Sequence, residues 1–372
     1  MNRGPEAEID LSALRYNLEI IRETVGKVPV IAVVKADAYG HGAAEVSRNL
    51  ISSGISCLAV AFTGEAQKLR EAGVKGKILV LFDTSDTGDY FRHNLIPVVH
   101  DLRTATAFSK EALRRGTRIA AHVKVDTGMG RIGFSAQSAV EDVGEIAGMG
   151  GIEVEGLMSH FSEADLTDKT YAALQIGKFR KVREGVSQKL GRPVMAHIAN
   201  SAAIISLEEA FFDAVRPGLI LYGYSPFNDD RGFIPLMKVR TRILVVRDLP
   251  AGTPVSYGRT FITKRRSRIA VVPAGYADGY SRLFSNNSEM LVRGRRVPVA
   301  GRVCMDLTML DVTDVEGVSE GDEVVILGRQ GNDTITAVEL SSRINTIPYD
   351  ILTTFGSRAR RWYVNGEQDT VA

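Results

Sequence analysis

The sequence predicts an α/β protein: an N-terminal (β/α)8 TIM barrel over residues 10–235, followed by a C-terminal mainly β domain over residues 236–372. In the first two thirds of the 372 residues, short β-branched runs alternate with longer helical patterns, which is typical of βα units and a parallel sheet. After residue 235 helical periodicity nearly disappears, and short alternating runs are separated by turn residues. We expect residues 1–9 to pair with the second domain.

Eight strand candidates with intervening helices account for the barrel. The strands are expected at 28–34, 57–62, 78–82, 96–99, 119–125, 154–159, 194–198 and 213–216, with helices that include 64–72, 102–115 and 167–189. A doubly wound open sheet is the alternative that this pattern leaves open. In the second domain, strands are expected at 240–246, 268–272, 289–292, 296–299, 308–312 and 323–327, and a helix at 337–344.

Composition limits the classes of function. The net charge of +2, from 46 basic and 44 acidic side chains, gives no reason to expect nucleic acid or a membrane surface as a partner. The two cysteines, Cys57 and Cys304, have neither the number for a disulfide framework nor the spacing of a zinc site, so we expect no metal. No segment is long enough to span a bilayer. A cytoplasmic protein is expected.

Unusual polar residues follow the predicted barrel strands. They are Lys35 after the first strand, Lys124 and Arg131 after the fifth, His160 after the sixth, Asn200 and Ser201 after the seventh, and Arg216 at the end of the eighth. Barrel enzymes build their active sites at these C-terminal strand ends. Independent surface charges would be scattered over both ends of the barrel, so the clustering indicates a functional site.

Lys35 lies in the run from Val33 to Gly42, which contains several small residues and Tyr39. A lysine that enters a barrel mouth is desolvated, which lowers its pKa from about 10.4 and frees the amine for a Schiff base. The small residues would let a cofactor approach, and the Tyr39 hydroxyl would bind a phosphate. A solvated lysine in a loop is the ordinary alternative.

Two later loops offer phosphate donors. Ser201 opens a helix, and Gly218 lets backbone approach an anion closely, although Asn200 followed by Ser201 also caps ordinary helices. Arg216 carries a guanidinium that stays protonated, so it can donate to a cofactor lying across the barrel mouth. His160 either orients Arg216, packs under the cofactor ring, or is a satisfied core histidine.

The second domain contributes aromatic residues beside glycines. The motifs are residues 255–259 with Tyr257, 275–280 with Tyr276, 301–306 with Met305 and Asp306, and 348–349 with Tyr349. Such tyrosines are usually turn or rim residues. Several of them in one β domain indicate a surface that completes a site, in the same chain or in a partner.

Together these runs resemble the alanine racemase family of fold-type-III pyridoxal-phosphate enzymes over nearly the whole chain. The resemblance implies that Lys35 holds pyridoxal 5'-phosphate and is one catalytic base. It implies that Tyr257 is the base on the opposite face, reaching the site from the other subunit of a homodimer. The further roles it implies are phosphate binding by Tyr39, Ser201, Tyr349, Gly218 and Leu219; cofactor contacts by His160, Asn200 and Arg216; substrate contacts by Arg131 and Met305; an entrance formed by Tyr276 and Asp306; and carbamylation of Lys124, which supports Arg131.

The reaction implied is the interconversion of L-alanine and D-alanine, which supplies D-alanine for peptidoglycan. A broad-specificity or serine racemase remains open, because one or two pocket residues decide the substrate. A decarboxylase of the same fold type is less favoured, since those enzymes place a carboxylate where this chain has Arg216. A non-catalytic cofactor carrier would not need the second domain. An aldolase-type barrel would use a Schiff-base lysine without a cofactor.

Overall fold

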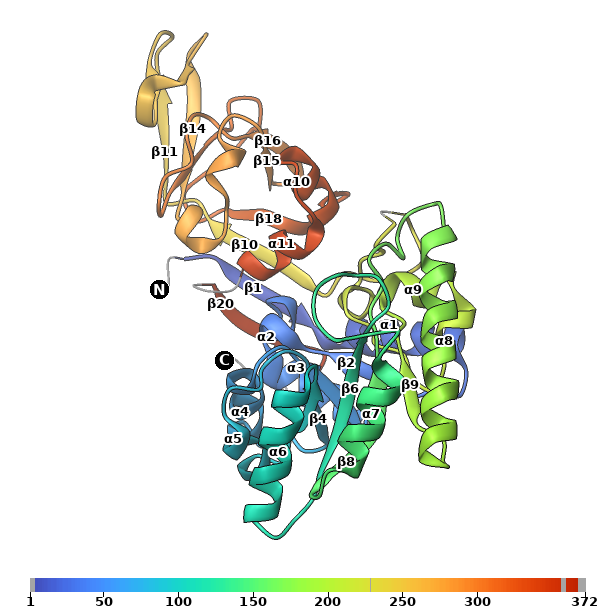
Figure 1. Ribbon diagram of the computed structural model, residues 1–372. Helices are drawn as coiled ribbons and strands as arrows, with labels where there is room; N and C mark the ends of the chain where they lie inside the picture. The colour runs from blue at the N-terminus through green and yellow to red at the C-terminus, as the bar shows by residue number, and fades with distance from the viewer. Residues whose placement is uncertain (1–3, 228, 356–358, 367–372) are drawn as a thin grey trace. The chain divides into compact units, whose positions relative to one another are not determined.

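The computed structural model describes residues 4–227, 229–355 and 359–366 (Figure 1). The chain forms two compact units. The barrel unit contains residues 15–38 and 43–233, and the β unit contains the described parts of residues 1–14, 39–42 and 234–372. Residues 1–3 and 367–372, at the two ends of the predicted second domain, lie outside the described residues. No helix in the described parts of the chain is long and apolar enough to cross a membrane.

The barrel unit is built on a parallel sheet in the order β2-β3-β4-β5-β6-β8-β9, with β7 paired to β6. The strands are β2 (Ile31–Val33), β3 (Cys57–Val60), β4 (Lys77–Val80), β5 (Ile96–Val99), β6 (Ile119–Asp126), β7 (Phe134–Ser135), β8 (Ile152–Met158) and β9 (Met195–His197).

Residues 213–217 close this sheet into a ring. The N–H groups of Ile31 and Val33 donate to the carbonyls of Val215 and Pro217 at 2.9 and 3.0 Å. On the other side, the Asp213 N–H donates to the carbonyl of Ala196 at 3.0 Å. Seven of the eight predicted positions hold a strand of this sheet, and the eighth, 213–216, pairs with Val30 through Val215. The predicted barrel is therefore confirmed, and the open-sheet alternative is excluded.

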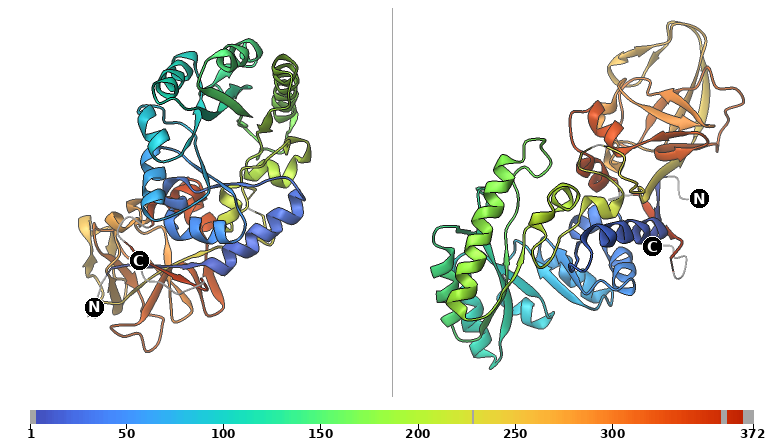
Figure 2. Two further views of the ribbon diagram at one scale, coloured as in Figure 1. Left: turned by 90° about the horizontal axis from the view of Figure 1, so that it is seen from below. Right: turned by 90° about the vertical axis from the view of Figure 1, so that its right-hand side faces the viewer.

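Helices lie on the outside of this sheet, in an arc that the left view of Figure 2 shows. They are α1 (Leu11–Val25), α3 (Ala43–Ser52), α4 (Thr63–Glu71), α5 (Thr87–Arg92), α6 (Leu102–Arg114), α7 (Ala139–Gly148), α8 (Thr170–Leu190) and α9 (Ser201–Ser206). Local sequence sets several of their ends. The Asp101 side chain accepts from the Thr104 N–H and so begins α6, and Gly191, at φ +64°, ends α8.

The β unit contains a sheet in the order β16-β15-β18-β10-β1-β20, with β19 paired to β18, a three-stranded sheet β11-β14-β17, and the pair β12-β13. Its elements are β1 (Glu6–Asp10), β10 (Met237–Arg242), β11 (Val245–Leu249), β12 (Pro254–Val255), β13 (Phe261–Ile262), β14 (Ser267–Val272), β15 (Glu289–Val292), β16 (Arg295–Pro298), β17 (Thr308–Asp311), β18 (Glu323–Gln330), β19 (Asp333–Ile335), α10 (Ala337–Arg343), α11 (Pro348–Thr354) and β20 (Arg360–Val364). Residues 6–9 pair antiparallel with β10, and residues 6–10 pair parallel with β20.

The predicted strand at 240–246 is wrong in one respect, because it spans two strands of different sheets. β10 ends at Arg242 and β11 begins at Val245. Between them, the Ile243 N–H donates to the backbone carbonyl of Asp322, and the Leu244 N–H donates to the backbone carbonyl of Val271. Alternating hydrophobicity continues through this change of sheet, so the pattern alone does not reveal it.

Candidate active site

The structure places the predicted cationic residues at the barrel strand ends close enough for their charges to interact. Burial lowers the pKa of Lys35, and the nearby charges of Arg131 and Arg216 lower it further. Burial also lowers the pKa of Lys124 well below its ordinary value, and the same two arginines add to the effect. Burial also lowers the pKa of His160 well below its ordinary value, and the charges of Arg216 and the other cations lower it further. These groups destabilise one another's charge, so the site is suited to an anion.

Lys35 begins a left-handed turn that was not predicted. Residues 36–39 all have φ between 51° and 54°, in a region that costs a non-glycine residue about 1 kcal/mol or more. A carboxylate of α4 holds this turn: Glu65 accepts from the Ala36 N–H at 2.6 Å and from the Ala61 N–H at 2.7 Å. The same carboxylate raises the pKa of Lys35 against the stronger lowering effects. Glu65 thus positions the segment that carries the lysine.

Arg131 and Lys35 flank the same aromatic ring. The Arg131 guanidinium carbon lies 5.3 Å from the centre of the Phe82 ring, and Lys35 Nζ lies 5.7 Å from it. Asp126 organises the loop before Arg131, since it accepts from the N–H groups of Gly128 and Arg131 at 2.8 and 3.2 Å. Partial burial raises the pKa of Asp126, but these and other backbone bonds lower it overall.

Lys124 is 3% exposed, and its Nζ has no hydrogen-bond partner among the described residues. Arg216 and Arg131 oppose its charge, and only Asp126 favours it. A buried ammonium without an acceptor is costly, so this position calls for a negative group.

Arg216 is held from several sides inside the barrel. Its Nη1 contacts His197 Nδ1 at 2.6 Å and donates to the His197 carbonyl at 2.8 Å. Its Nη2 donates to the Ser159 carbonyl at 2.7 Å and lies 3.3 Å from His160 Nδ1. Burial lowers the pKa of Arg216 to about 9, which leaves it charged at neutral pH. Arg216 is therefore a fixed cationic donor, and His160 is one of its partners.

Residues of the seventh and eighth predicted strand ends also meet. Ser201 Oγ accepts from the Gly218 N–H at 2.9 Å, which leaves its own proton available to an acceptor. Both residues are buried, and so is Leu219. Asn200 has a local role: its side chain accepts from the Ala203 N–H at 3.0 Å and begins α9.

Tyr39 belongs to the β unit, where its ring lies 5.8 Å from that of Tyr349. Burial raises the pKa of the Tyr39 hydroxyl, and Tyr349 adds to this. The glycines that follow serve close packing of protein against protein. A Cβ on Gly40 would lie 2.2 Å from the Leu352 carbonyl oxygen, and one on Gly42 would overlap the Tyr363 hydroxyl.

The other predicted residues of the β unit lie on three loops that are tied together. Ser256 Oγ, next to Tyr257, donates to the Arg302 carbonyl at 2.6 Å. The Tyr276 N–H donates to the carbonyl of Cys304, next to Met305, at 3.0 Å. Tyr257, Tyr276 and Met305 are 68%, 42% and 53% exposed, and Asp306 beside them is also exposed. These loops form an exposed aromatic surface of the β unit.

Sequence reasoning missed the groups that hold the predicted residues in place. They include Glu65, Phe82, His122 and His197. A histidine inside a predicted buried strand was the available signal for the last two. Glu65 and Phe82 carry no such signal, since they act through contacts between neighbouring βα units.

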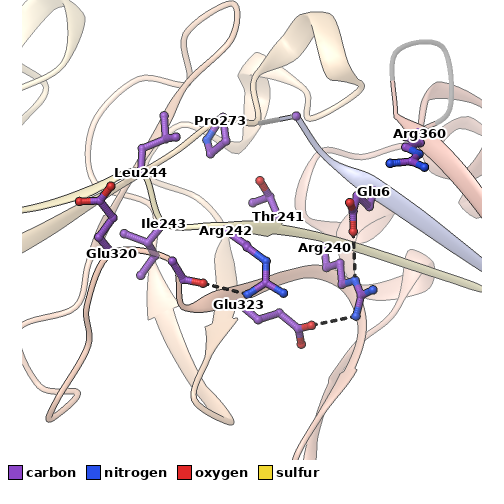
Figure 3. Close-up of a pocket in the computed structure, with 12 residues that line it drawn as sticks. Glu6, Arg240, Thr241, Arg242, Ile243, Leu244, Pro273, Glu320, Glu323 and Arg360 are labelled. Atoms are coloured by element: carbon purple, nitrogen blue, oxygen red, sulfur yellow. Dashed lines mark hydrogen bonds and ion pairs between the residues drawn. The ribbon is translucent and has the colours of Figure 1, made fainter. Parts of the chain in front are cut away.

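A cavity of about 310 Å³ lies in the β unit (Figure 3). Several of its polar side chains have partners within the unit: Arg240 pairs with Glu323 at 3.1 Å and with Glu6 at 3.6 Å, and Arg242 donates to the Gly321 carbonyl. None of the predicted site residues is among the described residues that line it.

Comparisons with known proteins identify the family of this chain. Residues 9–226 match the N-terminal domain of alanine racemase, and residues 236–363 match its C-terminal domain. The chain belongs to the alanine racemase family. Alanine racemase from Thermodesulfovibrio yellowstonii is 50% identical over 373 residues, covering 99% of this chain and 100% of that protein.

Solved alanine racemase structures share the fold of this family member. The enzyme from D-cycloserine-producing Streptomyces lavendulae superimposes with a TM-score of 0.93 at 34% identity, covering 98% of each chain. Alanine racemase from Bartonella henselae, described with covalently bound pyridoxal phosphate, gives a TM-score of 0.88 at 28% identity, covering 97% of this chain and 99% of that one.

Proposed function

We propose that the chain interconverts L-alanine and D-alanine with pyridoxal 5'-phosphate bound to Lys35. Family membership supports the reaction. The observation that carries the cofactor assignment is the group of mutually destabilised cations around Lys35, whose lowered pKa favours a nucleophilic amine. An aldolase without a cofactor would also use a lysine of lowered pKa, and family membership argues against it.

The residues present fit this cofactor. Ser201 Oγ accepts from the Gly218 N–H at 2.9 Å, which brings together the loops after the seventh and eighth strands, where barrels frequently bind phosphate. Arg216 supplies a buried cationic donor for the pyridine nitrogen. Tyr39 and Tyr349, paired in the β unit, and the backbone of Leu219 would complete the phosphate site.

The chemistry is a proton transfer at the substrate Cα. When bound, the cofactor withdraws electrons from this carbon and makes its proton acidic. Lys35 would hold or deliver the proton on the D-face, and Tyr257 would do so on the L-face. Tyr257 would act as a base beside positive charge, which Arg131 would supply while binding the substrate carboxylate.

We propose that Tyr257 acts in the partner's site, so the working unit is a homodimer. The exposure of Tyr257, Tyr276 and Met305 on neighbouring loops of the β unit supports this, since exposed apolar patches often mark an interface. Met305 would then line the substrate pocket of the partner, and Tyr276 and Asp306 would lie at its entrance.

Carbamylation of Lys124 is also part of this proposal. It would convert the unpartnered amine into an anion for Arg131.

We further assign residues 10–235 as the cofactor-binding barrel domain and residues 236–372, with 1–9, as the β domain. We place the enzyme in the cytoplasm, where its two free cysteines would stay reduced.

Single L-amino acids, followed by chiral product analysis, test the reaction. We expect D-alanine from L-alanine, with serine as the next best substrate. Release of carbon dioxide from ornithine or diaminopimelate, without turnover of alanine, would reverse the assignment in favour of a decarboxylase.

Exchange of the Cα proton in D2O tests the two bases. Tyr257→Phe should slow exchange from L-alanine at least about 100-fold, the usual contribution of one acid-base group, while D-alanine still exchanges without inversion. Lys35→Ala is the control that should abolish exchange from both enantiomers and the visible absorbance of the lysine-bound cofactor. Equal exchange from both enantiomers in Tyr257→Phe would contradict the assignment.

A further inference from the structure

His122 extends the contacts of Arg216 into the barrel core. Its Nδ1 lies 2.7 Å from Nε2 of His197, and His197 Nδ1 in turn lies 2.6 Å from Arg216 Nη1. Both histidines are buried, at 4% and 0% exposure. His122 on β6, His197 on β9 and Arg216 in the segment 213–217 therefore form one chain of nitrogen contacts.

Each proton in this chain has a single consistent position. A guanidinium has only donors, so His197 Nδ1 must accept from Arg216. Burial lowers the pKa of His197 well below its ordinary value, so the ring is neutral and carries its proton on Nε2. That N–H can only donate to His122 Nδ1. Burial also lowers the pKa of His122, to about 4, so its own proton lies on Nε2.

The outer end of the chain is a carboxylate. His122 Nε2 lies 4.0 Å from Glu155 Oε2, about 1 Å beyond hydrogen-bond distance. This oxygen is buried and has no hydrogen-bond partner among the described residues, while Lys77 holds the other oxygen. The orientation of the whole chain, with donors pointing from Arg216 towards Glu155, matches this acceptor.

The strand beside His122 is shaped for its ring. β6 and β8 pair with a register shift between Ala121 and His122, which places His122 opposite Gly156. A Cβ on Gly156 would lie 2.7 Å from His122 Nδ1. Gly156 does not need a glycine for its backbone conformation, because its φ is not positive. The space above Gly156 is therefore needed by the imidazole.

We propose that His122 is a positioning residue that fixes the His197 ring as the acceptor for Arg216 and so keeps Arg216 aimed at the cofactor nitrogen. Without His122, the His197 N–H is a buried donor with no acceptor, and such a group costs about 1–3 kcal/mol. His197 would relieve this cost by rotating, and Arg216 would lose its shortest contact. Only the kinetic consequence rests on the proposed function; the tautomer and orientation of His197 do not.

Nitrogen-15 spectra of histidine-labelled protein, without cofactor, test the arrangement directly. The chain has six histidines, and His197→Gln assigns the signal of interest. His122→Leu should remove the protected Nε2–H signal of His197 and shift both ring nitrogens. His122→Asn should preserve the signal, because Asn Oδ1 is as many bonds from Cβ as His Nδ1 and can accept the same proton.

A second pair of variants leaves His122 in place. Gly156→Ala should disturb the His197 signal as His122→Leu does, because the added methyl displaces the imidazole. Gly177→Ala on α8 is the matched control, since a Cβ there meets nothing within 4 Å. This pair keeps the test informative if His122→Leu fails to fold.

Alanine kinetics of the loaded dimer provide the second readout. We expect kcat to fall about tenfold in His122→Leu and Gly156→Ala, which corresponds to about 1.4 kcal/mol, with KM changed less than about twofold. His122→Asn should restore kcat. An unchanged His197 signal in both His122→Leu and Gly156→Ala would overturn the proposal, and so would failure of His122→Asn to preserve it. Failure of wild type to racemise alanine would refute the proposed function and leave the spectra to decide the role of His122.

Discussion

Replacing Lys124 by methionine should stabilise the unloaded protein at neutral pH. The side chain is 3% exposed and its Nζ has no hydrogen-bond partner in the described residues. Leaving a buried polar group unpaired costs about 1–3 kcal/mol, and methionine fills a similar volume without the charge. For a unit of this size, about 2–4 °C accompany each kcal/mol, so Lys124→Met should raise the unfolding temperature by roughly 2–12 °C.

The effect should depend on pH with a defined sign. The pKa of Lys124 is lower in the folded protein than its ordinary value of 10.5. Between these two pKa values the unfolded chain binds more protons, so the stability of the wild type rises with pH in that window. The advantage of Lys124→Met should therefore shrink between pH 7 and about pH 10.5, where the amine becomes neutral in both states.

Urea unfolding in buffer free of carbon dioxide measures this difference, with Lys178→Met, at an exposed position on α8, as the control. Added bicarbonate should then stabilise the wild type and leave Lys124→Met unchanged, because a carbamate on Lys124 would pair with Arg131. Equal stability of wild type and Lys124→Met at pH 7, with equal slopes against pH and no bicarbonate effect, would refute the reasoning.

Three further changes separate local roles. Ser201→Ala should weaken cofactor affinity at least about tenfold through loss of a charge-assisted hydrogen bond, whereas Asn200→Ala should mainly lower stability by about 1 kcal/mol through loss of the α9 cap; titration of the unloaded protein and urea unfolding compare them. Gly40→Ala should destabilise by more than about 2 kcal/mol, since its φ is +84° and a Cβ would meet a carbonyl of α11; a stability near that of wild type would contradict this packing. Glu65→Gln removes a charge that raises the pKa of Lys35, so cofactor attachment, followed by absorbance, should extend to lower pH; a shift to higher pH would show that the carboxylate acts otherwise.

The barrel was predictable because hydrophobic residues recur with a different period in its strands than in its helices. Short β-branched runs at regular spacing gave the right strand positions in the barrel, because each strand is buried on both faces, by the barrel interior and by the outer helices. The β unit was harder. The run at 240–246 stays alternating while the chain passes from one sheet to another at Ile243. Residues 348–354 form α11 although no periodic pattern was assigned there.

The grouping of the candidate site residues was predictable where a residue's place on a strand end decides its surroundings. Lys35 and Arg216 fall in this group, because barrel geometry alone brings the ends of strands together. The left-handed turn after Lys35 could not be predicted, because its residues include no glycine until Gly40 and its stability comes from Glu65, one βα unit away. Asn200 shows the reverse difficulty: the same pattern fits a cap and a cofactor ligand, and its described contact is that of a cap.

The polar residues inside the barrel follow one physical requirement. Barrel interiors are normally filled by branched apolar side chains, and each buried polar group must find partners or cost stability. Arg216, His197 and His122 contact one another in sequence, so each orients the next. Lys124 lies in the same interior, and its amine has no hydrogen bond within the described residues. This difference separates Lys124, whose position calls for an added anion, from the three groups that orient one another. We therefore expect Lys124 to respond to bicarbonate, and the chain of Arg216, His197 and His122 to respond to loss or displacement of the His122 acceptor nitrogen.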